Sequence, residues 1–168
     1  MLLHLRLLAT GALLAGATVG HAAGQSASYT FFGSACSGGG PPFSVVGTPR
    51  LGGSFTLVTQ TSVRRTRYET NDDVFILTGA STPGLDLRGL NLPGISACGF
   101  LLASTELILV APATTLDPQP YSIVFPIPNV ASLLGGTFHQ QVLLLSRAIS
   151  FPPHSLLASR GGRGVIGR

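Results

Sequence analysis

Cys36 and Cys98 are the residues of this chain with the most versatile chemistry, and no other cysteine is present. A pair of cysteines can bind a metal, form a disulfide or act as free thiols. Neither has a CxxC partner or a histidine nearby, which disfavours a zinc site. In an oxidising compartment such a pair forms a disulfide, and closing a long loop stabilises a fold by on the order of 4 kcal/mol. We therefore expect a Cys36–Cys98 disulfide, with two reactive thiols as the alternative.

Known catalytic motifs are missing from the chain. It has no GxSxG elbow, HExxH, Walker loop or dinucleotide fingerprint, and SxxK is excluded because lysine is absent. His139 lies in a predicted strand and His154 in a predicted loop, each without an acidic companion nearby in the sequence. We interpret both as structural or exposed. The sequence predicts no catalytic residue, cofactor or metal site, unless the fold joins a histidine with an acid and a hydroxyl.

Adjacent carboxylates occur once, at Asp72 and Asp73 after Asn71. Calcium takes about six to eight oxygen ligands, more than this loop offers, so we interpret the segment as a plain turn. Glu106 and Asp117 are each isolated in the sequence, so they do not predict a glycosidase pair.

Aromatic side chains that can stack on sugar rings include no tryptophan. The candidates are Tyr29, Phe31, Phe32, Tyr68 and Tyr121. We expect most of them to pack in the core or across strands, which leaves glycan binding without a distinctive platform.

Basic residues cluster once, in a polar segment between two predicted strands, from Gln60 to Asp73. Binding residues are often found in such loops, and arginine forks suit carboxylate or sulfate groups. We interpret the segment first as an ordinary solvated hairpin. If the chain binds a ligand, we expect this segment to bind it, with an acidic polysaccharide or another envelope component as the ligand. The formal net charge of +4 is small for a nucleic-acid-binding protein. The candidate binding residues are Arg64, Arg65, Arg67 and Tyr68.

Short strands are the elements expected to position these residues, because 22 glycines and 12 prolines disfavour long helices. β-Branched and aromatic residues between turn signals indicate where the strands lie. The predicted strands cover residues 29–32, 43–46, 54–59, 73–78, 98–104, 106–110, 121–125, 137–145 and 163–167.

Alternation assigns faces to two of these strands. In SFTLVT, Phe55, Leu57 and Thr59 share one face. In the strand over residues 137–145, one face carries Phe138, Gln140, Val142 and Leu144. Its other face becomes apolar towards the end, so we expect this strand in the centre of a sheet.

The fold class predicted from these strands is all-β. Short strands separated by turns favour a two-layer antiparallel β-sandwich, with a small barrel as the alternative. One short helical turn is predicted at residues 130–134, capped by Asn129 and ended by Gly135.

The first 23 residues have the layout of a secretory signal peptide: basic residues, an apolar run from Leu7 to about Val19, and then small residues. The run is shorter than the roughly 20 residues of a membrane span, so an N-terminal anchor is the alternative. We expect a signal-peptide helix in residues 1–23, cleavage within 22–24, and a single domain over 24–168 with no further transmembrane segment.

The order of motifs along the mature chain resembles a family of secreted all-β domains. The motifs are LGGSFTLV at 51–58, PGISACG at 93–99, IPNVASLLGGTFHQQ at 127–141 and a terminal IG at 166–167. They match the family pattern LGxxFxL, PGxxxCG, IPNxxSLxGxxFxxQ and IG, although the family's usual tryptophan after FxxQ is missing. The resemblance implies an all-β domain of environmental bacteria rich in surface proteins. It brings no established catalytic residues.

Together these features favour a secreted, non-catalytic structural or interaction module located outside the cell, at the cell surface or in the periplasm. A glycan-binding accessory module is the second hypothesis. A hydrolase is the third.

Overall fold

A computed structural model describes residues 24–35, 42–60, 72–90, 100–113, 120–146 and 155–168. The predicted signal-peptide helix, the two cysteines and the four candidate binding residues all lie outside these residues. The Cys36–Cys98 disulfide therefore stays a prediction. Within the described part of the chain, no helix is long and apolar enough to cross a membrane.

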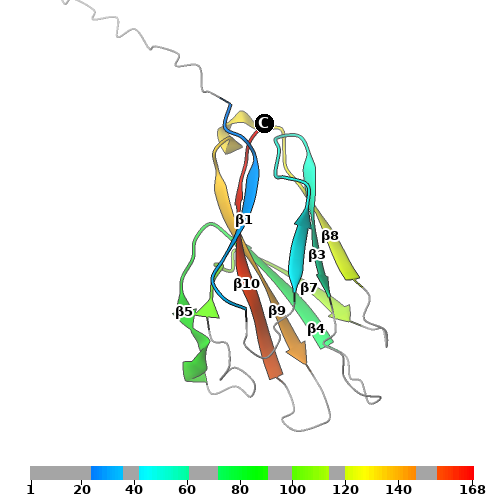
Figure 1. Cartoon of the computed structure of the whole chain (residues 1–168), viewed down its shortest axis with the longest axis vertical. Coiled ribbons are helices and arrows are strands. Elements are labelled where there is room, and N and C mark those ends of the chain that lie inside the picture. The colour runs from blue at the N-terminus through cyan, green and yellow to red at the C-terminus, as the bar shows by residue number, and fades with distance from the viewer. Residues whose placement is uncertain (1–23, 36–41, 61–71, 91–99, 114–119, 147–154) are drawn as a thin grey trace, which may run out of the picture.

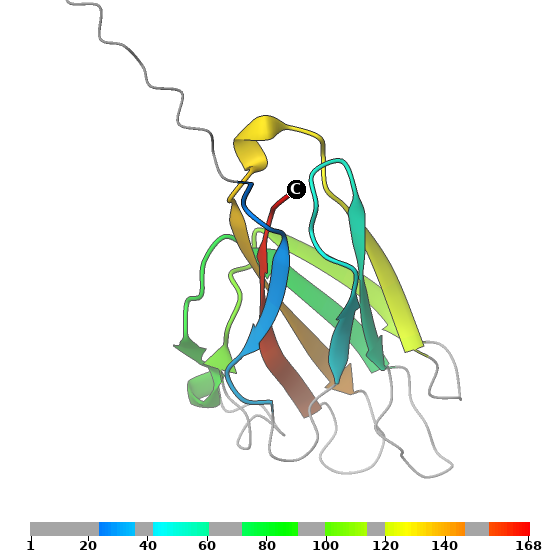
Figure 2. The same ribbon diagram turned by 45° about the horizontal axis from the view of Figure 1, so that its top comes forward.

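Two antiparallel sheets pack face to face (Figures 1 and 2). The five-stranded sheet runs in the order β1 (Ser28–Phe32), β10 (Ser155–Val165), β9 (Thr137–Ser146), β4 (Asp72–Gly79) and β7 (Leu107–Ala113). The three-stranded sheet runs in the order β2 (Phe43–Val46), β3 (Ser54–Gln60) and β8 (Pro120–Pro126). The sheets do not close on each other, so the two-layer all-β sandwich is confirmed and the barrel alternative is wrong.

The period-two pattern of the sequence decides which side chains enter the core. Every second residue of β8 is half-buried and the others are exposed. In β3 the predicted inner residues Phe55, Leu57 and Thr59 are all buried. Between the sheets, Phe55 stacks on Phe125 at 5.3 Å and on Phe138 at 5.5 Å between ring centroids. Each fully buried side chain of this kind stabilises the fold by roughly 1.5–3 kcal/mol.

β9 lies between β10 and β4, as its apolar second face predicts. Its predicted inner residues face the three-stranded sheet, with Val142 and Leu144 in the core cluster. Gln140 and Gln141 are both 0 % exposed although they point to opposite faces. Their burial requires hydrogen-bond partners on both sides of the sheet.

β10 starts at Ser155, well before the predicted strand 163–167. It contains a bulge between Ala158 and Gly161. Glycine disfavours a strand in a prediction from sequence, but β10 requires glycine at two positions. A side chain at Gly161 or Gly164 would collide with the ring of Phe32 or Phe138, respectively. Aromatic rings from the neighbouring strands cover these glycines and compensate for their missing side chains.

A long connection from residue 80 to residue 106 joins β4 to β7; we call it the β4–β7 connection. It contains β5 (Leu85–Asp86), the 3₁₀ turn η1 (Leu87–Leu90) and β6 (Phe100–Leu101). β6 pairs with β5 in a separate two-stranded sheet. The predicted strand 98–104 is therefore only two residues long where the structure describes it, because its partner is this short local strand.

The predicted helical turn is the 3₁₀ helix η3 (Ala131–Leu133). Asn129 was expected as its cap, but Val130 precedes the first helical residue in extended conformation and no side chain caps the turn. Gly135 follows with φ of 80°, as predicted for a left-handed end.

The first and the last described residues meet at one end of the sandwich, which we call the proximal end (Figures 1 and 2). The N–H of Arg168 donates to the carbonyl of Gln25 at 3.1 Å. Gly167 is bonded on both sides: its N–H donates to Pro49, and its carbonyl accepts from Leu51. The last residues therefore tie the first described residues to the loop before β3.

Candidate functional site

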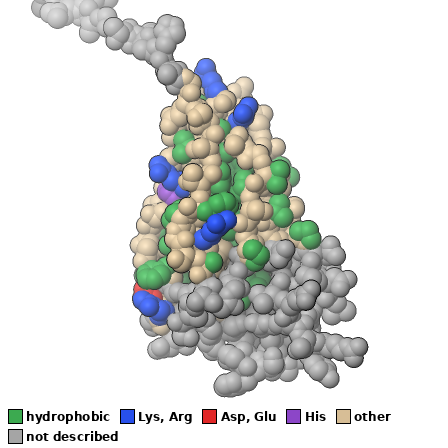
Figure 3. All heavy atoms as spheres, in the orientation of Figure 1, with side chains coloured by type: hydrophobic (Ala, Val, Ile, Leu, Met, Phe, Trp, Pro, Cys, Tyr) green, Lys and Arg blue, Asp and Glu red, His purple; other side chains and the backbone are tan. Residues whose placement is uncertain are grey.

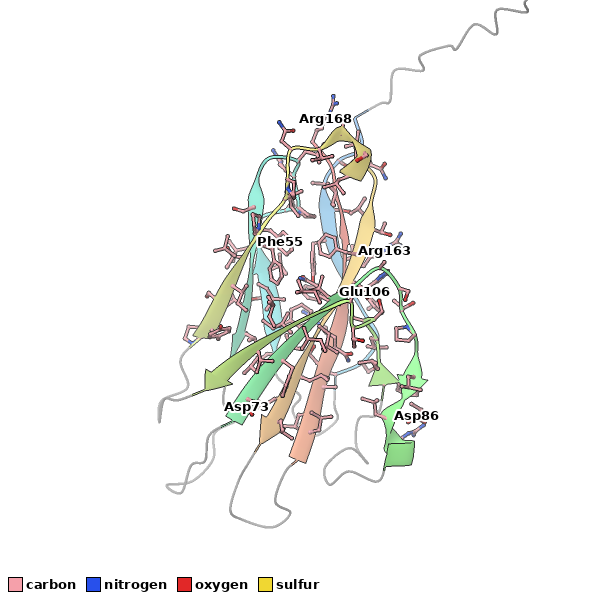
Figure 4. The ribbon with its side chains drawn as sticks, turned by 180° about the vertical axis from the view of Figure 1, so that it is seen from behind. Phe55, Asp73, Asp86, Glu106, Arg163 and Arg168 are labelled. Atoms are coloured by element: carbon pink, nitrogen blue, oxygen red, sulfur yellow. The ribbon has the colours of Figure 1, made fainter. Side chains whose placement is uncertain are left out.

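A row of polar side chains crosses the outer face of the five-stranded sheet; we call it the polar row. Cross-strand pairing places Thr30 beside Arg163, Arg163 beside His139, and His139 beside Gly79. The inward direction of Phe138 and Gln140 leaves His139 on the outer face. Glu106 completes the row by lying over Gly79 (Figure 4).

Glu106 is held as an ionised carboxylate. A hydrogen bond from the Ser104 hydroxyl lowers its pKa most, and the backbone N–H groups of Glu106 and Ala80 lower it further. Ser104 also bonds to Ser81: its N–H donates to the Ser81 carbonyl at 2.9 Å, and its hydroxyl accepts from the Ser81 N–H at 3.0 Å. A side chain at Gly79 would collide with Glu106 and Ser104, so glycine permits this close approach. These bonds join the two ends of the β4–β7 connection.

His139 is a half-buried imidazole. Burial lowers its pKa first and the positive charge of Arg163 lowers it further, while a hydrogen bond with the backbone of Ala80 acts in the opposite direction. Its Nδ1 is buried without a hydrogen-bond partner. The ring of Phe32 meets the imidazole edge to face at 5.8 Å between centroids. His139 is therefore neutral at pH 7.

The polar row brings an acid, a histidine and a hydroxyl close together, but not in a catalytic arrangement. The Ser104 hydroxyl bonds to Glu106 rather than to His139. A general acid needs a raised carboxyl pKa, whereas that of Glu106 is lowered. Within the described residues, the row thus joins two chain segments, and it does not have the geometry of a nucleophile with its base.

Two buried glutamines were not predicted as important residues. Gln140 lies inside the sandwich, where its amide oxygen accepts from the Tyr29 hydroxyl at 2.9 Å and its nitrogen donates to Thr78 at 3.1 Å. Gln141 lies on the outer face and holds the β4–β7 connection. It accepts from the Leu102 N–H at 2.8 Å and donates to the Phe100 carbonyl at 3.0 Å. The signal in the sequence was two consecutive amides directly before the apolar end of a predicted strand.

The described aromatic candidates for sugar stacking are used in packing. Tyr29, Phe31 and Tyr121 pack against the core cluster. Burial also raises the pKa of Tyr29 above its ordinary value. Phe32 lies on the outer face but covers Gly161 and meets His139. None of these four rings presents a free platform.

The predicted binding segment is anchored at the end of the sandwich opposite the chain termini, which we call the distal end. β3 ends at Gln60 and β4 begins at Asp72, so only residues 61–71 lie between them, outside the described part. Asp72 and Asp73 belong to β4 rather than to a turn, because Asp73 is paired with strands on both sides. Figure 4 shows Asp73 at the distal end and Arg168 at the proximal end.

Charged side chains are sparse over the described surface. Figure 3 shows basic side chains singly among apolar and uncharged polar ones. Arg88 forms an exposed ion pair with Asp86, and Arg160 lies over the Phe31 ring at 3.7 Å. No group of three or more His, Cys, Asp or Glu that could hold a metal ion occurs in the described ranges.

Comparison of the chain with models of protein families, with curated proteins and with solved structures finds no match. The membership suggested by the sequence motifs therefore stays a proposal.

Proposed function

We propose that this chain is a secreted, non-catalytic interaction module of the cell surface, and a member of the secreted all-β family that its motifs resemble. The observation that carries the proposal is the separation of the chain termini from the strand connections that reach the distal end. β3, β7 and β9 end there, and β4, β8 and β10 begin there, since Gln60 pairs with Pro120 and Ser146 with Ser155.

This separation suits a binding module. Loops held by rigid strands are where binding residues concentrate. The connection over residues 61–71 supplies three arginines and Tyr68, and the connection over residues 147–154 adds Arg147 and His154. The first described residues and the C-terminal residues lie at the other end, so attachment through either leaves the distal end open to a ligand.

The ligand we propose is an acidic polysaccharide of the cell envelope. Guanidinium groups bind carboxylate or sulfate groups through paired hydrogen bonds, and such binding weakens as salt rises. Glycan recognition by aromatic stacking has less support, because the four described candidate rings pack within the fold.

The test is retention on an acidic-glycan column. Replacing Arg64, Arg65 and Arg67 with serine is expected to abolish retention while the thermal midpoint stays unchanged. The matched control removes the same charge from three exposed arginines outside the distal end, in the variant Arg50→Ser, Arg163→Ser and Arg168→Ser. It is expected to bind like the native chain.

Two results would overturn the proposed binding site. Retention of the first variant would show that the segment 61–71 is not involved. Loss of retention only in the control would move the site to the other arginines, among which Arg163 belongs to the polar row.

A further inference from the structure

β7 is an edge strand with an exposed apolar surface. In the described part of the chain it pairs only with β4, at the end of the five-stranded sheet. Its sequence LILVAPA has no charged residue. Leu107, Ile108 and Val110 are 45 %, 48 % and 57 % exposed. An apolar strand with a free edge is a template for pairing with another strand, and proteins usually protect such edges.

Pro112 indicates which backbone groups of β7 point away from β4. It lies opposite Asp73 and has no N–H to donate, so this pair belongs to the type without mutual hydrogen bonds. Along two antiparallel strands, residue pairs that exchange hydrogen bonds alternate with pairs that do not. The N–H and C=O groups of Ile108 and Val110 therefore point to the free edge. The same two residues carry exposed side chains on the outer face.

The other edge strands of the two large sheets are better protected than β7. β2 has four residues and β1 has five, which limits the number of bonds that either can form. β8 is as long as β7, but proline occupies both of its ends, at Pro120 and Pro126. Short edges and edge prolines are common devices against association. β7 has a proline only near its last residue.

We propose that β7 joins two copies of this chain edge to edge, through antiparallel pairing with β7 of the second copy. Pairing centred on Leu109 places Ile108 opposite Val110 of the second copy, so their edge-facing N–H and C=O groups bond to each other. No charge opposes a like charge, because the strand carries none. The same surface serves both copies, as a two-fold axis requires.

The apolar outer face supports this pairing. Cross-strand pairing places Val110 beside Phe75, and Phe75 beside Leu143. Phe75 and Leu143 are half-buried. Pairing at β7 would continue this apolar row into the second copy and cover the exposed flank of Val110. A charged strand or a basic ligand would gain no partner there, since the described part of β7 offers no opposite charge.

The experiment is the mass in solution, by light scattering after gel filtration, of protein purified from a host that exports it. We expect a dimer whose fraction rises with concentration and which runs as a monomer on a non-reducing denaturing gel. Val110→Lys is expected to weaken association by at least about tenfold, because it places two lysines at one edge. Val110→Pro is expected to do the same, because it removes an edge-facing N–H that β4 does not use.

The matched control is Val124→Lys, at a similarly exposed valine of the other sheet's edge strand. It is expected to remain a dimer. Amide exchange at Ile108 and Val110 should slow as concentration rises in this control and in the native chain. A native monomer at all concentrations, a covalent dimer, or a dimer lost in Val124→Lys but kept in both Val110 variants would each overturn the proposal.

Discussion

His139, Gln140 and Gln141 are consecutive, yet each meets a different environment. Alternation sends Gln140 into the sandwich and its two neighbours to the outer face. His139 lies among charged groups of the polar row, whereas Gln141 lies beneath backbone groups of the β4–β7 connection. In this position the pKa of His139 is lower than its ordinary value.

We predict that His139 makes the fold less stable on mild acidification. Its pKa is lower in the folded chain than the ordinary value of 6.5. Below about pH 6.5 the unfolded chain therefore takes up a proton that the folded chain does not, and the free energy of unfolding falls until the lowered pKa is passed. Urea unfolding at intervals between about pH 7.5 and 5.5 measures this slope.

His139→Gln should flatten that part of the pH profile. His154→Gln is the matched control, and it should keep the native slope in this window. An identical slope in the native chain and in His139→Gln would contradict the assignment, because the titrating group would then lie elsewhere.

Among the described residues, a few side chains hold the β4–β7 connection on the outer sheet face. Glu106 and Ser104 join its ends, and Gln141 fixes its return limb through Leu102 and Phe100. Ala103 between them is fully buried. These bonds lie outside the two main sheets, so loss of one should loosen the connection without unfolding the sandwich.

We predict that Gln141→Leu lowers the free energy of unfolding by about 1–3 kcal/mol, because buried backbone groups lose their partners. It should also speed amide exchange at Leu102. Gln140→Leu is the matched control: it costs a similar amount by leaving the Tyr29 hydroxyl without its acceptor, but it acts on the opposite face. Equal exchange at Leu102 in both variants would contradict the role given to Gln141.

The proximal end closes the molecule by backbone contact. Gly167 is buried and packs against the backbone of Ala27 and Gln25, which leaves no room for a side chain. Backbone atoms cannot move aside without breaking the bonds that hold the termini together. The terminal glycine of the IG motif is therefore a packing requirement of the whole sandwich.

Gly167→Ala should lower the free energy of unfolding by about 1–3 kcal/mol, the usual cost of overpacking. The matched control is Gly24→Ala, since a methyl group there meets nothing within 4 Å. Denaturant midpoints measure both changes. Equal midpoints for the two variants would show that the chain ends can separate at little cost.

The sequence by itself determined the fold class and most strands, because each depends on local alternation. SFTLVT shows which face Phe55 and Leu57 occupy, and the apolar second face of residues 137–145 places that strand centrally. Both follow from side chains pointing alternately to the two faces of a sheet. The candidate binding residues were proposed from the charge of a polar segment between two strands, and they stay a prediction because they lie outside the described residues.

Only the tertiary structure decided what the remaining residues contact. The glycines of β10 become strand residues because rings from β1 and β9 cover them, and the strand predicted over residues 98–104 shortens because its partner is Leu85–Asp86. Gln141 gains its role from Leu102, 39 residues away, and Glu106 gains part of its role from the backbone of Ala80. Such contacts join distant segments, and the local pattern of a sequence does not encode them.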